Sequence, residues 1–261
     1  MRFALGLEYD GRPHCGWQSQ PSKCAVQDKL QAALSTLAQD DIHVIAAGRT
    51  DAGVHACAQV VHFDTKAERP LTAWVRGVNT HLPETVRVLW AQAVSEDFHA
   101  RFSAISRGYR YVLYNHRLRP ALAAGRVGWF HEPLDVQQMT LAARSLLGEH
   151  DFTSFRAAAC QARSPVKSLT QADLHRHGDY ILFDFAASAF LHHMVRNIVG
   201  CLVYVGARRR PAHWLAELLA ARDRTRAAPT FAPDGLYLTQ VRYDARFALP
   251  DHGAPPYISG L

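Results

Sequence analysis

Cysteine is scarce in this sequence: 261 residues contain five cysteines, at positions 15, 24, 57, 160 and 201. Their number is odd, they are spread along the chain, and no Cys-x-x-Cys pair occurs. Disulfide-stabilised small domains and zinc knuckles need closely spaced, paired cysteines. The pattern therefore argues against both kinds of protein, and we expect a reduced, cytoplasmic one.

Long hydrophobic runs are also missing. No stretch approaches the roughly 20 apolar residues of a transmembrane helix. The segment 2–9 alternates as a strand does and lacks the basic start and apolar run of a signal peptide. We expect no membrane association, and the 48% of hydrophobic residues are sufficient for a substantial core.

Lysine is rare among the basic residues, since only Lys23, Lys29, Lys66 and Lys167 contribute to the 29 Lys and Arg. The formal charge of +6 and the pI near 9.2 favour an anionic partner such as nucleic acid. Arginine forks match phosphate oxygens and stack on bases, so the arginine excess suits RNA. A compositional bias of the source genome would give the same excess.

Hydrophobic periodicity predicts the same order of elements twice along the chain. In the first half we expect strand 2–9, helix 26–37, strands 42–47 and 58–63, helix 71–79 and strand 86–94. In the second half we expect strand 109–114, helix 136–147, a hairpin of strands 169–175 and 180–187, helix 190–205, a helix opened by Pro211, and strand 236–241. Each half then follows the split βαβ order, strand-helix-strand-strand-helix-strand, with one extra helix in the second.

This order predicts an α+β fold built from two RRM-like or ferredoxin-like units. The expected units are 1–104 and 105–247, followed by a tail, 248–261. We expect one continuous, mostly antiparallel sheet with helices on one face, a free opposite face and a central cleft.

The most informative stretch is Gly-Arg-Thr-Asp-Ala-Gly-Val-His at 48–55, which places an acid directly after a short strand. Gly48 and Gly53 flank Asp51 and allow the tight loop conformations that present a side chain to a ligand. Two interpretations are open. Asp51 either forms a Thr-Asp turn or cap, or it is a reactive carboxylate.

The segment 98–119 interleaves basic and aromatic residues, which favours either single-stranded RNA binding or an ordinary edge strand. In the apolar helix expected at 190–205, Arg196 needs a counter-charge, either Asp51 or another acid. The adjacent His192 and His193 point about 100° apart on a helix, so we expect no metal site. The clusters at 208–210 and 222–226 are either solvated helix ends or phosphate contacts.

Six segments, in this order along the chain, resemble the bacterial tRNA pseudouridine synthase A family. They are Tyr-Asp-Gly at 9–11 with Gly-Trp-Gln at 16–18, the loop 48–55, and the segments 98–104, 150–156, 192–200 and 235–238. The resemblance runs from residue 9 to about 247. Ordered matches of this kind are far more specific than any single motif.

The resemblance implies a cofactor-free homodimer that acts on the anticodon stem-loop of tRNA. It converts the uridines at tRNA positions 38, 39 and 40 to pseudouridine, by cutting the N1–C1′ bond, turning the uracil and rejoining it through C5. The reaction is an isomerisation and needs no redox partner.

By the same resemblance, Asp51 is the catalytic carboxylate, and Arg196 pairs with it and keeps it charged. Tyr109 stacks on the target uracil and Leu236 closes the pocket. Because the target bases must leave the stack, Arg49 fills the vacated space.

Three further arginines, Arg69, Arg101 and Arg163, are expected to contact tRNA. Two rival functions stay open: a hydrolase that stops at cleavage of the glycosidic bond, and a non-catalytic RNA binder or chaperone. A glycosidase usually needs a second carboxylate, and none accompanies the loop 48–55 in sequence.

Overall fold

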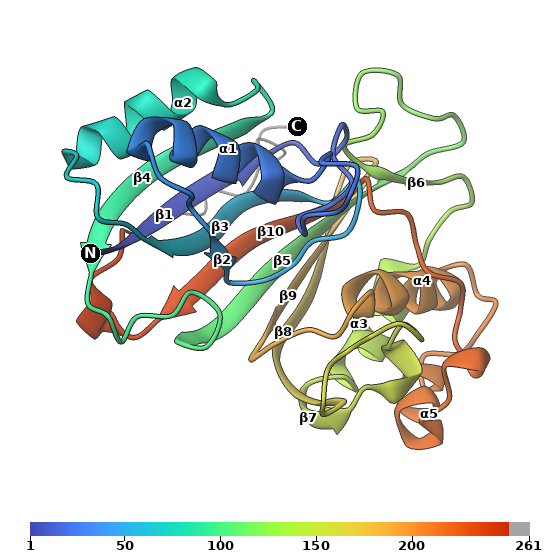
Figure 1. Ribbon diagram of the computed structural model, residues 1–261. Coiled ribbons are helices and arrows are strands. Elements are labelled where there is room, and N and C mark those ends of the chain that lie inside the picture. Colours follow the sequence, from blue (N-terminus) through green and yellow to red (C-terminus); the bar gives the residue numbers. More distant parts are fainter. Residues whose placement is uncertain (251–261) are drawn as a thin grey trace. The chain divides into compact units, whose positions relative to one another are not determined.

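The computed structural model describes residues 1–250 (Figure 1). This part of the chain contains ten strands, mostly antiparallel, and five α-helices, which confirms the α+β class. The chain forms two compact units: unit 1 comprises Met1–Ile105 with the described residues from Tyr237 onward, and unit 2 comprises Ser106–Leu236. Of the tail expected at 248–261, residues 251–261 lie outside the described part. No helix among the described residues has the length and hydrophobicity needed to cross a bilayer.

Unit 1 contains a sheet in the hydrogen-bonded order β4-β1-β3-β10, with β2 paired to β3. Its elements are β1 (Arg2–Tyr9), α1 (Val26–Ala38), β2 (Ile45–Ala46), β3 (His55–Asp64), a π-helical turn (Ala73–Gly77), α2 (Val78–His81), β4 (Val86–Val94) and β10 (Leu236–Tyr243). β1 pairs antiparallel with β3 and β4, whereas β10 runs parallel to β3. Helices α1 and α2 lie on one face of this sheet (Figure 1).

Both faces of the unit 1 sheet carry a core. On the helix side, the rings of Phe3, Phe63 and Trp74 meet at centroid distances of 5.2–5.7 Å. Strand residues alternate between faces, and the opposite side holds a second buried cluster that includes Trp90 and Phe98. The expectation of a free face opposite the helices is therefore wrong for unit 1, because apolar side chains from the segments after β4 and β10 cover it.

Unit 2 contains the antiparallel strand order β5-β9-β8-β7, with the short β6 parallel to β5. Its elements are β5 (Ala104–Asn115), β6 (Gly128–Phe130), α3 (Val136–Arg144), β7 (Gly148–Asp151), β8 (Val166–His177), β9 (Tyr180–Ala187), α4 (Met194–Gly206) and α5 (Trp214–Ala221). Helix α4 is buried along almost its whole length, since few of its residues are polar. It packs against α3.

The last strand belongs to the first unit, whereas the sequence places it in the second. In β10, Tyr237 and Leu238 pair with His55 and Ala56 of β3. Val241 and Tyr243 then pack against the Trp90–Phe98 cluster. Unit 1 is completed by residues that follow unit 2 in the sequence. A single boundary along the sequence therefore cannot separate the two units.

Candidate active site

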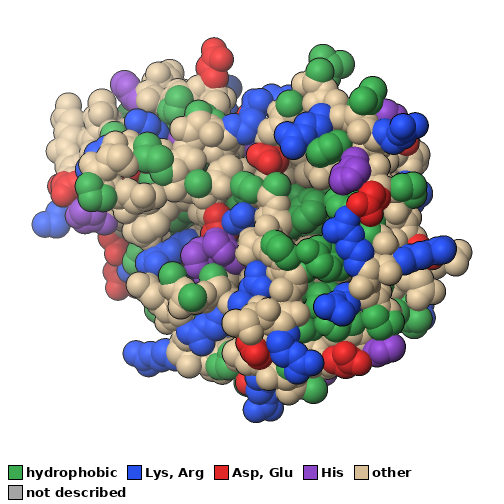
Figure 2. Space-filling model, turned by 90° about the vertical axis from the view of Figure 1, so that its right-hand side faces the viewer, with side chains coloured by type: hydrophobic (Ala, Val, Ile, Leu, Met, Phe, Trp, Pro, Cys, Tyr) green, Lys and Arg blue, Asp and Glu red, His purple; other side chains and the backbone are tan. Residues whose placement is uncertain are grey.

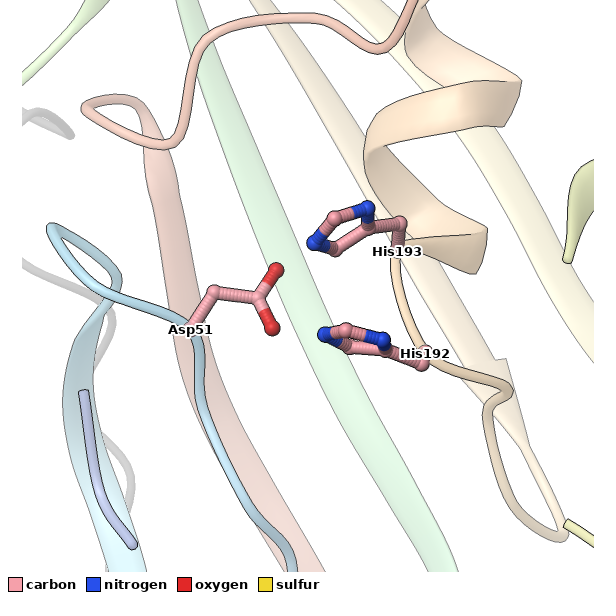
Figure 3. A group of neighbouring side chains, drawn as sticks. All are labelled: Asp51, His192 and His193. Carbon is pink, nitrogen blue, oxygen red and sulfur yellow. The ribbon is translucent and has the colours of Figure 1, made fainter. Parts of the chain in front are cut away.

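Asp51 lies on the loop between β2 and β3 and is half-buried (Figure 3). The backbone N–H of Val54 donates to the Asp51 carbonyl at 3.1 Å, which closes a tight turn. Gly53 has a φ of +79° in this turn, a conformation that side chains with a Cβ rarely adopt. The turn interpretation and the reactive interpretation are therefore compatible, because the turn fixes where the carboxylate points.

The segment before α1 supports this loop from outside. Trp17 N–H donates to the Thr50 carbonyl at 2.9 Å. Gly16 has a φ of +90°, and a Cβ there would lie 2.7 Å from the Thr50 carbonyl oxygen. At Gly11 a Cβ would lie 2.1 Å from the Val54 carbonyl oxygen. Gly16 and Gly11 therefore allow the segment before α1 to lie in close contact with the backbone of the loop on either side of Asp51.

Buried polar side chains hold the loop from inside. Tyr9 Oη and Thr50 Oγ1 are 2.8 Å apart, and Gln59 Nε2 donates to the Gly48 carbonyl at 2.8 Å. Gln59 Nε2 also lies 3.4 Å from Tyr9 Oη. Burial raises the pKa of Tyr9 to about 12, so its hydroxyl stays neutral and serves as a fixed hydrogen-bonding group.

A histidine and an aspartate fix the end of the loop. Gly11 N–H donates to His55 Nδ1 at 3.1 Å, and Asp10 Oδ1 lies 3.4 Å from the same atom. The His55 ring stacks on Tyr237 of β10, with centroids 4.6 Å apart. Burial acts to raise the pKa of Asp10, but the hydrogen bonds from Arg12 and the charges of His55 and Arg12 together lower it by more, so the net shift of this pKa is downward. Sequence reasoning assigned no role to His55 or Tyr237, and the paired Tyr-Asp-Gly and Gly-Val-His motifs are the signal that could have suggested one.

Two cysteines in the supporting segment form a disulfide. Cys15 and Cys24 are bonded, with Cα atoms 5.5 Å apart. The expectation that the cysteines form no bridge is wrong for this pair, because the turn before α1 brings residues nine positions apart together, which their spacing in sequence does not reveal. Within residues 1–250, Cys57, Cys160 and Cys201 take no part in a disulfide.

In unit 2, Tyr109 lies on β5 and is 9% exposed. Its ring meets Phe190 edge-on at a centroid distance of 5.0 Å. Leu236 is buried at the start of β10, and its N–H donates to the Pro233 carbonyl at 2.8 Å. Both residues are held in place by local contacts within this unit.

Arg196 is half-buried in the first turn of α4. His192 and His193 directly precede this helix (Figure 3). Arg196 Nε donates to the Phe231 carbonyl at 2.9 Å, and Phe231 N–H donates to the Arg196 carbonyl at 3.2 Å. This pair of hydrogen bonds orients the guanidinium. Because Asp51 belongs to unit 1 and Arg196 to unit 2, the Asp51–Arg196 ion pair stays a prediction.

The buried side-chain amide of Asn197, next to Arg196, forms hydrogen bonds to three other residues of unit 2. Asn197 Nδ2 donates to the Phe155 carbonyl at 2.8 Å, and its Oδ1 accepts from Thr230 Oγ1 at 2.7 Å and from Arg224 at 3.1 Å. Sequence reasoning overlooked Asn197. An amide inside an apolar helix is the signal, since a buried polar side chain requires partners.

The four arginines expected to contact tRNA are all exposed. Arg49 and Arg69 lie on loops of unit 1 and Arg163 on a loop of unit 2. Arg101 lies over the ring of Phe102 at 5.5 Å, and Phe102 is itself 76% exposed. Lys and Arg side chains are spread over the face drawn in Figure 2. Exposed guanidinium groups and rings are what a nucleic-acid surface requires.

Comparisons with known proteins agree with these features. A family model described as tRNA pseudouridine synthase matches residues 7–103 and 142–244. The tRNA pseudouridine synthase A of Thiobacillus denitrificans is 64% identical over 251 residues, which cover 96% of each chain. That of Methylobacillus flagellatus is 60% identical over 250 residues, again covering 96% of each chain. That of Paraburkholderia phytofirmans is 56% identical over 249 residues, 95% of this chain and 92% of the relative.

Among solved structures, a chain of a Cbf5-Nop10-Gar1 complex is 11% identical with a TM-score of 0.35. The match covers 90% of this chain and 48% of that chain. A likeness this low supports no inference about the present molecule.

Proposed function

The chain belongs to the tRNA pseudouridine synthase family, and we propose that it isomerises uridine to pseudouridine in the anticodon stem-loop of tRNA, at positions 38, 39 and 40. Membership rests on relatives up to 64% identical over nearly the whole chain. The single observation that carries the proposal is Asp51, a carboxylate presented by a turn that is braced on both sides by backbone and buried side chains.

Asp51 acts as the catalytic group, either as the nucleophile toward the nucleoside or as a proton acceptor. The N1–C1′ bond breaks, the C5–C1′ bond forms, and the proton on C5 leaves to solvent while N1 gains one. The atoms balance within the nucleoside, so the proposal requires no cofactor. A rigid loop suits this role because small misplacements of a reacting group slow a reaction strongly.

Tyr109, Arg196 and Leu236 complete the site in this proposal. Tyr109 presents a ring to the uracil, and Leu236 supplies an apolar wall. Arg196 serves as the counter-charge of the Asp51 carboxylate. Their local order in unit 2 supports these roles, since each is fixed by a ring contact or a backbone hydrogen bond.

The arginines recognise the RNA. Arg49 lies two residues from Asp51, so it is well placed to fill the space left by a flipped nucleotide. Arg69, Arg101 and Arg163 hold phosphates. We further infer that the enzyme works in the cytoplasm, where its tRNA substrate is found, and that it acts as a homodimer.

The test is to incubate the pure protein with tRNA transcripts without any additive and to map pseudouridine by chemical tagging. Asp51→Asn should lower the rate by at least about a thousandfold, since a group that takes part in bond making is removed, while the Kd for tRNA stays within about threefold. Asp41→Asn, an exposed loop carboxylate, is the matched control.

Two outcomes contradict the proposal. Release of free uracil in place of pseudouridine would identify a hydrolase. Full activity of Asp51→Asn would remove Asp51 from the chemistry and favour a binder or chaperone.

A further inference from the structure

Unit 2 contains a concave pocket of about 520 Å³ at the point where α4 ends. Three consecutive arginines, Arg208, Arg209 and Arg210, line it together with Asp135 and Gln138 from the start of α3. Its volume is within the range of pockets that take small ligands or parts of larger ones. We refer to it as the 208–210 pocket.

The backbone fixes the positions of these arginines. Arg208 has a φ of +58°, which reverses the chain after α4. The N–H groups of Arg209 and Arg210 then both donate to the Tyr204 carbonyl, at 2.9 and 3.3 Å. Asp135 N–H donates to the Gly206 carbonyl at 2.9 Å, which joins α3 to the same corner. The pocket is therefore a built part of the fold.

The charges around the pocket leave a positive excess. Asp135 Oδ2 lies 3.4 Å from Arg208 Nη2, and the Arg208 side chain is 83% exposed. Arg209 forms an ion pair with Glu132. Three guanidinium groups face two carboxylates, so the set carries one net positive charge. That charge matches a phosphodiester, with one negative charge, better than a phosphate monoester, with about two.

Aromatic rings orient the guanidinium groups. Arg209 lies over the rings of Phe130 and Tyr204 at 5.6 and 5.4 Å, and Arg210 lies over Trp214 at 5.4 Å. Tyr204 and Trp214 are themselves stacked. A guanidinium held by its face against a ring keeps its N–H edge available for oxygen acceptors. Arginines supported by rings are a typical arrangement for contacting RNA.

We propose that the 208–210 pocket binds a phosphodiester of the RNA substrate, with Arg208 and Arg210 donating to its oxygens. The inference rests on the proposed function, which supplies RNA as the anion. The proposal gives the arginine cluster a role in RNA binding. A cluster that were only a solvated helix end would have no such role. The pocket contributes affinity and takes no part in bond making.

The experiment compares three variants that each remove one positive charge: Arg208→Gln, Arg210→Gln and the control Arg144→Gln. Arg144 is exposed in the last turn of α3, whereas the pocket lies at the first. For Arg208→Gln and Arg210→Gln we expect KM for tRNA to rise about 3- to 10-fold with unchanged kcat. The reason is that the enzyme–tRNA complex and the transition state lose the same binding free energy. The slope of log Kd against log salt should fall by about one. Arg144→Gln should resemble the wild type.

Any one of three other results would overturn the inference. If the pocket variants match Arg144→Gln in KM and salt slope, the cluster is only a solvated helix end. If they bind tRNA normally but lose saturable binding of uridine monophosphate, the pocket takes a free nucleotide. If kcat falls and KM does not change, the arginines act in the chemistry.

Thermal midpoints within about 2 °C of the wild type would show that the variants are folded. Fluorescence anisotropy with labelled tRNA separates this inference from the proposed function. A wild type that forms no pseudouridine contradicts the function, yet the difference in tRNA affinity between the pocket variants and Arg144→Gln still tests the pocket.

Discussion

Several side chains around Asp51 fix its loop through buried hydrogen bonds. Tyr9, Thr50 and Gln59 form a buried hydrogen-bonded set beneath it. Removing one member would leave another buried polar group unsatisfied, which costs about 1–3 kcal/mol. Such residues affect the reaction through geometry, so their loss should reduce activity and stability together, in contrast to the loss of Asp51.

His62 provides a pH-dependent prediction at this scale. It is buried on β3, its Nδ1 accepts from Ala100 N–H at 3.1 Å, and His99 lies beside it. Burial, together with the charges of Arg2 and His99, lowers the pKa of His62 from its ordinary 6.5 to about 4. The folded state therefore holds this ring neutral, and the unfolded state takes up a proton first as the pH falls.

The sign of the effect follows from the linkage between protonation and folding. The stabilisation from neutral His62 is complete above pH 6.5 and is lost as the pH falls toward about 4. We expect the urea midpoint to drop more in the wild type than in His62→Asn, which keeps an acceptor and cannot titrate, between about pH 7 and about pH 4.5. Equal drops in both proteins would contradict the assignment.

Among the elements, the segment before α1 acts as an outer brace for the Asp51 loop. Gly16→Ala should lower the rate of pseudouridine formation at least about tenfold, because the new methyl group pushes on the Thr50 carbonyl and shifts the loop. Gly178→Ala is the matched control, since Gly178 also has a positive φ but has no atom within 4 Å of an added Cβ. It should change the rate less than about twofold, at a stability cost of about 1–2 kcal/mol. Similar rates for the two variants would show that the brace does not matter.

The Cys15–Cys24 bridge belongs to the same element. Closing a loop between cysteines nine positions apart is worth about 2–3 kcal/mol in the chain-entropy description. Dithiothreitol should therefore lower the thermal midpoint of the wild type by about 5–10 °C. It should not change that of the double variant Cys15→Ser/Cys24→Ser, and Cys57→Ser should respond like the wild type. If dithiothreitol left the thermal midpoint of the wild type unchanged, the bridge would not stabilise the protein.

The elements also show what sequence can and cannot predict. Strands 2–9 and 86–94 were placed correctly because their apolar residues extend along the whole strand. The short β6 and β7 were missed, since three or four residues are too few to display a period. Helix α4 begins at Met194 and not at 190, because His193 adopts a φ of +62°.

For the candidate site, the sequence singles out Asp51 as a prediction but does not indicate which side chains support its loop. An acid between two glycines after a short strand is visible in one segment. Tyr9 meets Thr50, and Gln59 meets Tyr9 and Gly48, only in the folded sheet. The contacts of His55 with Asp10 and Tyr237 are likewise set by strand register. Contacts across strands depend on pairing that no local pattern encodes.

At the scale of the whole molecule, unit 1 depends on residues at the far end of the chain. Phe247 belongs to its second core cluster, and Val241 and Tyr243 pack against that cluster. We expect a chain that ends after Gly235 to be largely insoluble or to lose unit 1's cooperative melting, because the edge of β3 and this cluster become exposed. A chain that ends after Pro250 is the control. Normal melting of the shorter chain would show that β10 is dispensable.

This interleaved chain path has a consequence for biosynthesis. A ribosome delivers everything from Ser106 to Leu236 before Tyr237 emerges, which at roughly 5–20 residues per second takes on the order of ten seconds. During that interval the sheet of unit 1 lacks β10, whereas the middle of the chain can already begin to fold. Newborn molecules are thus most vulnerable to aggregation before Tyr237 emerges, and the Asp51 loop gains the ring of Tyr237 as a neighbour of His55 only after unit 2 has been synthesised.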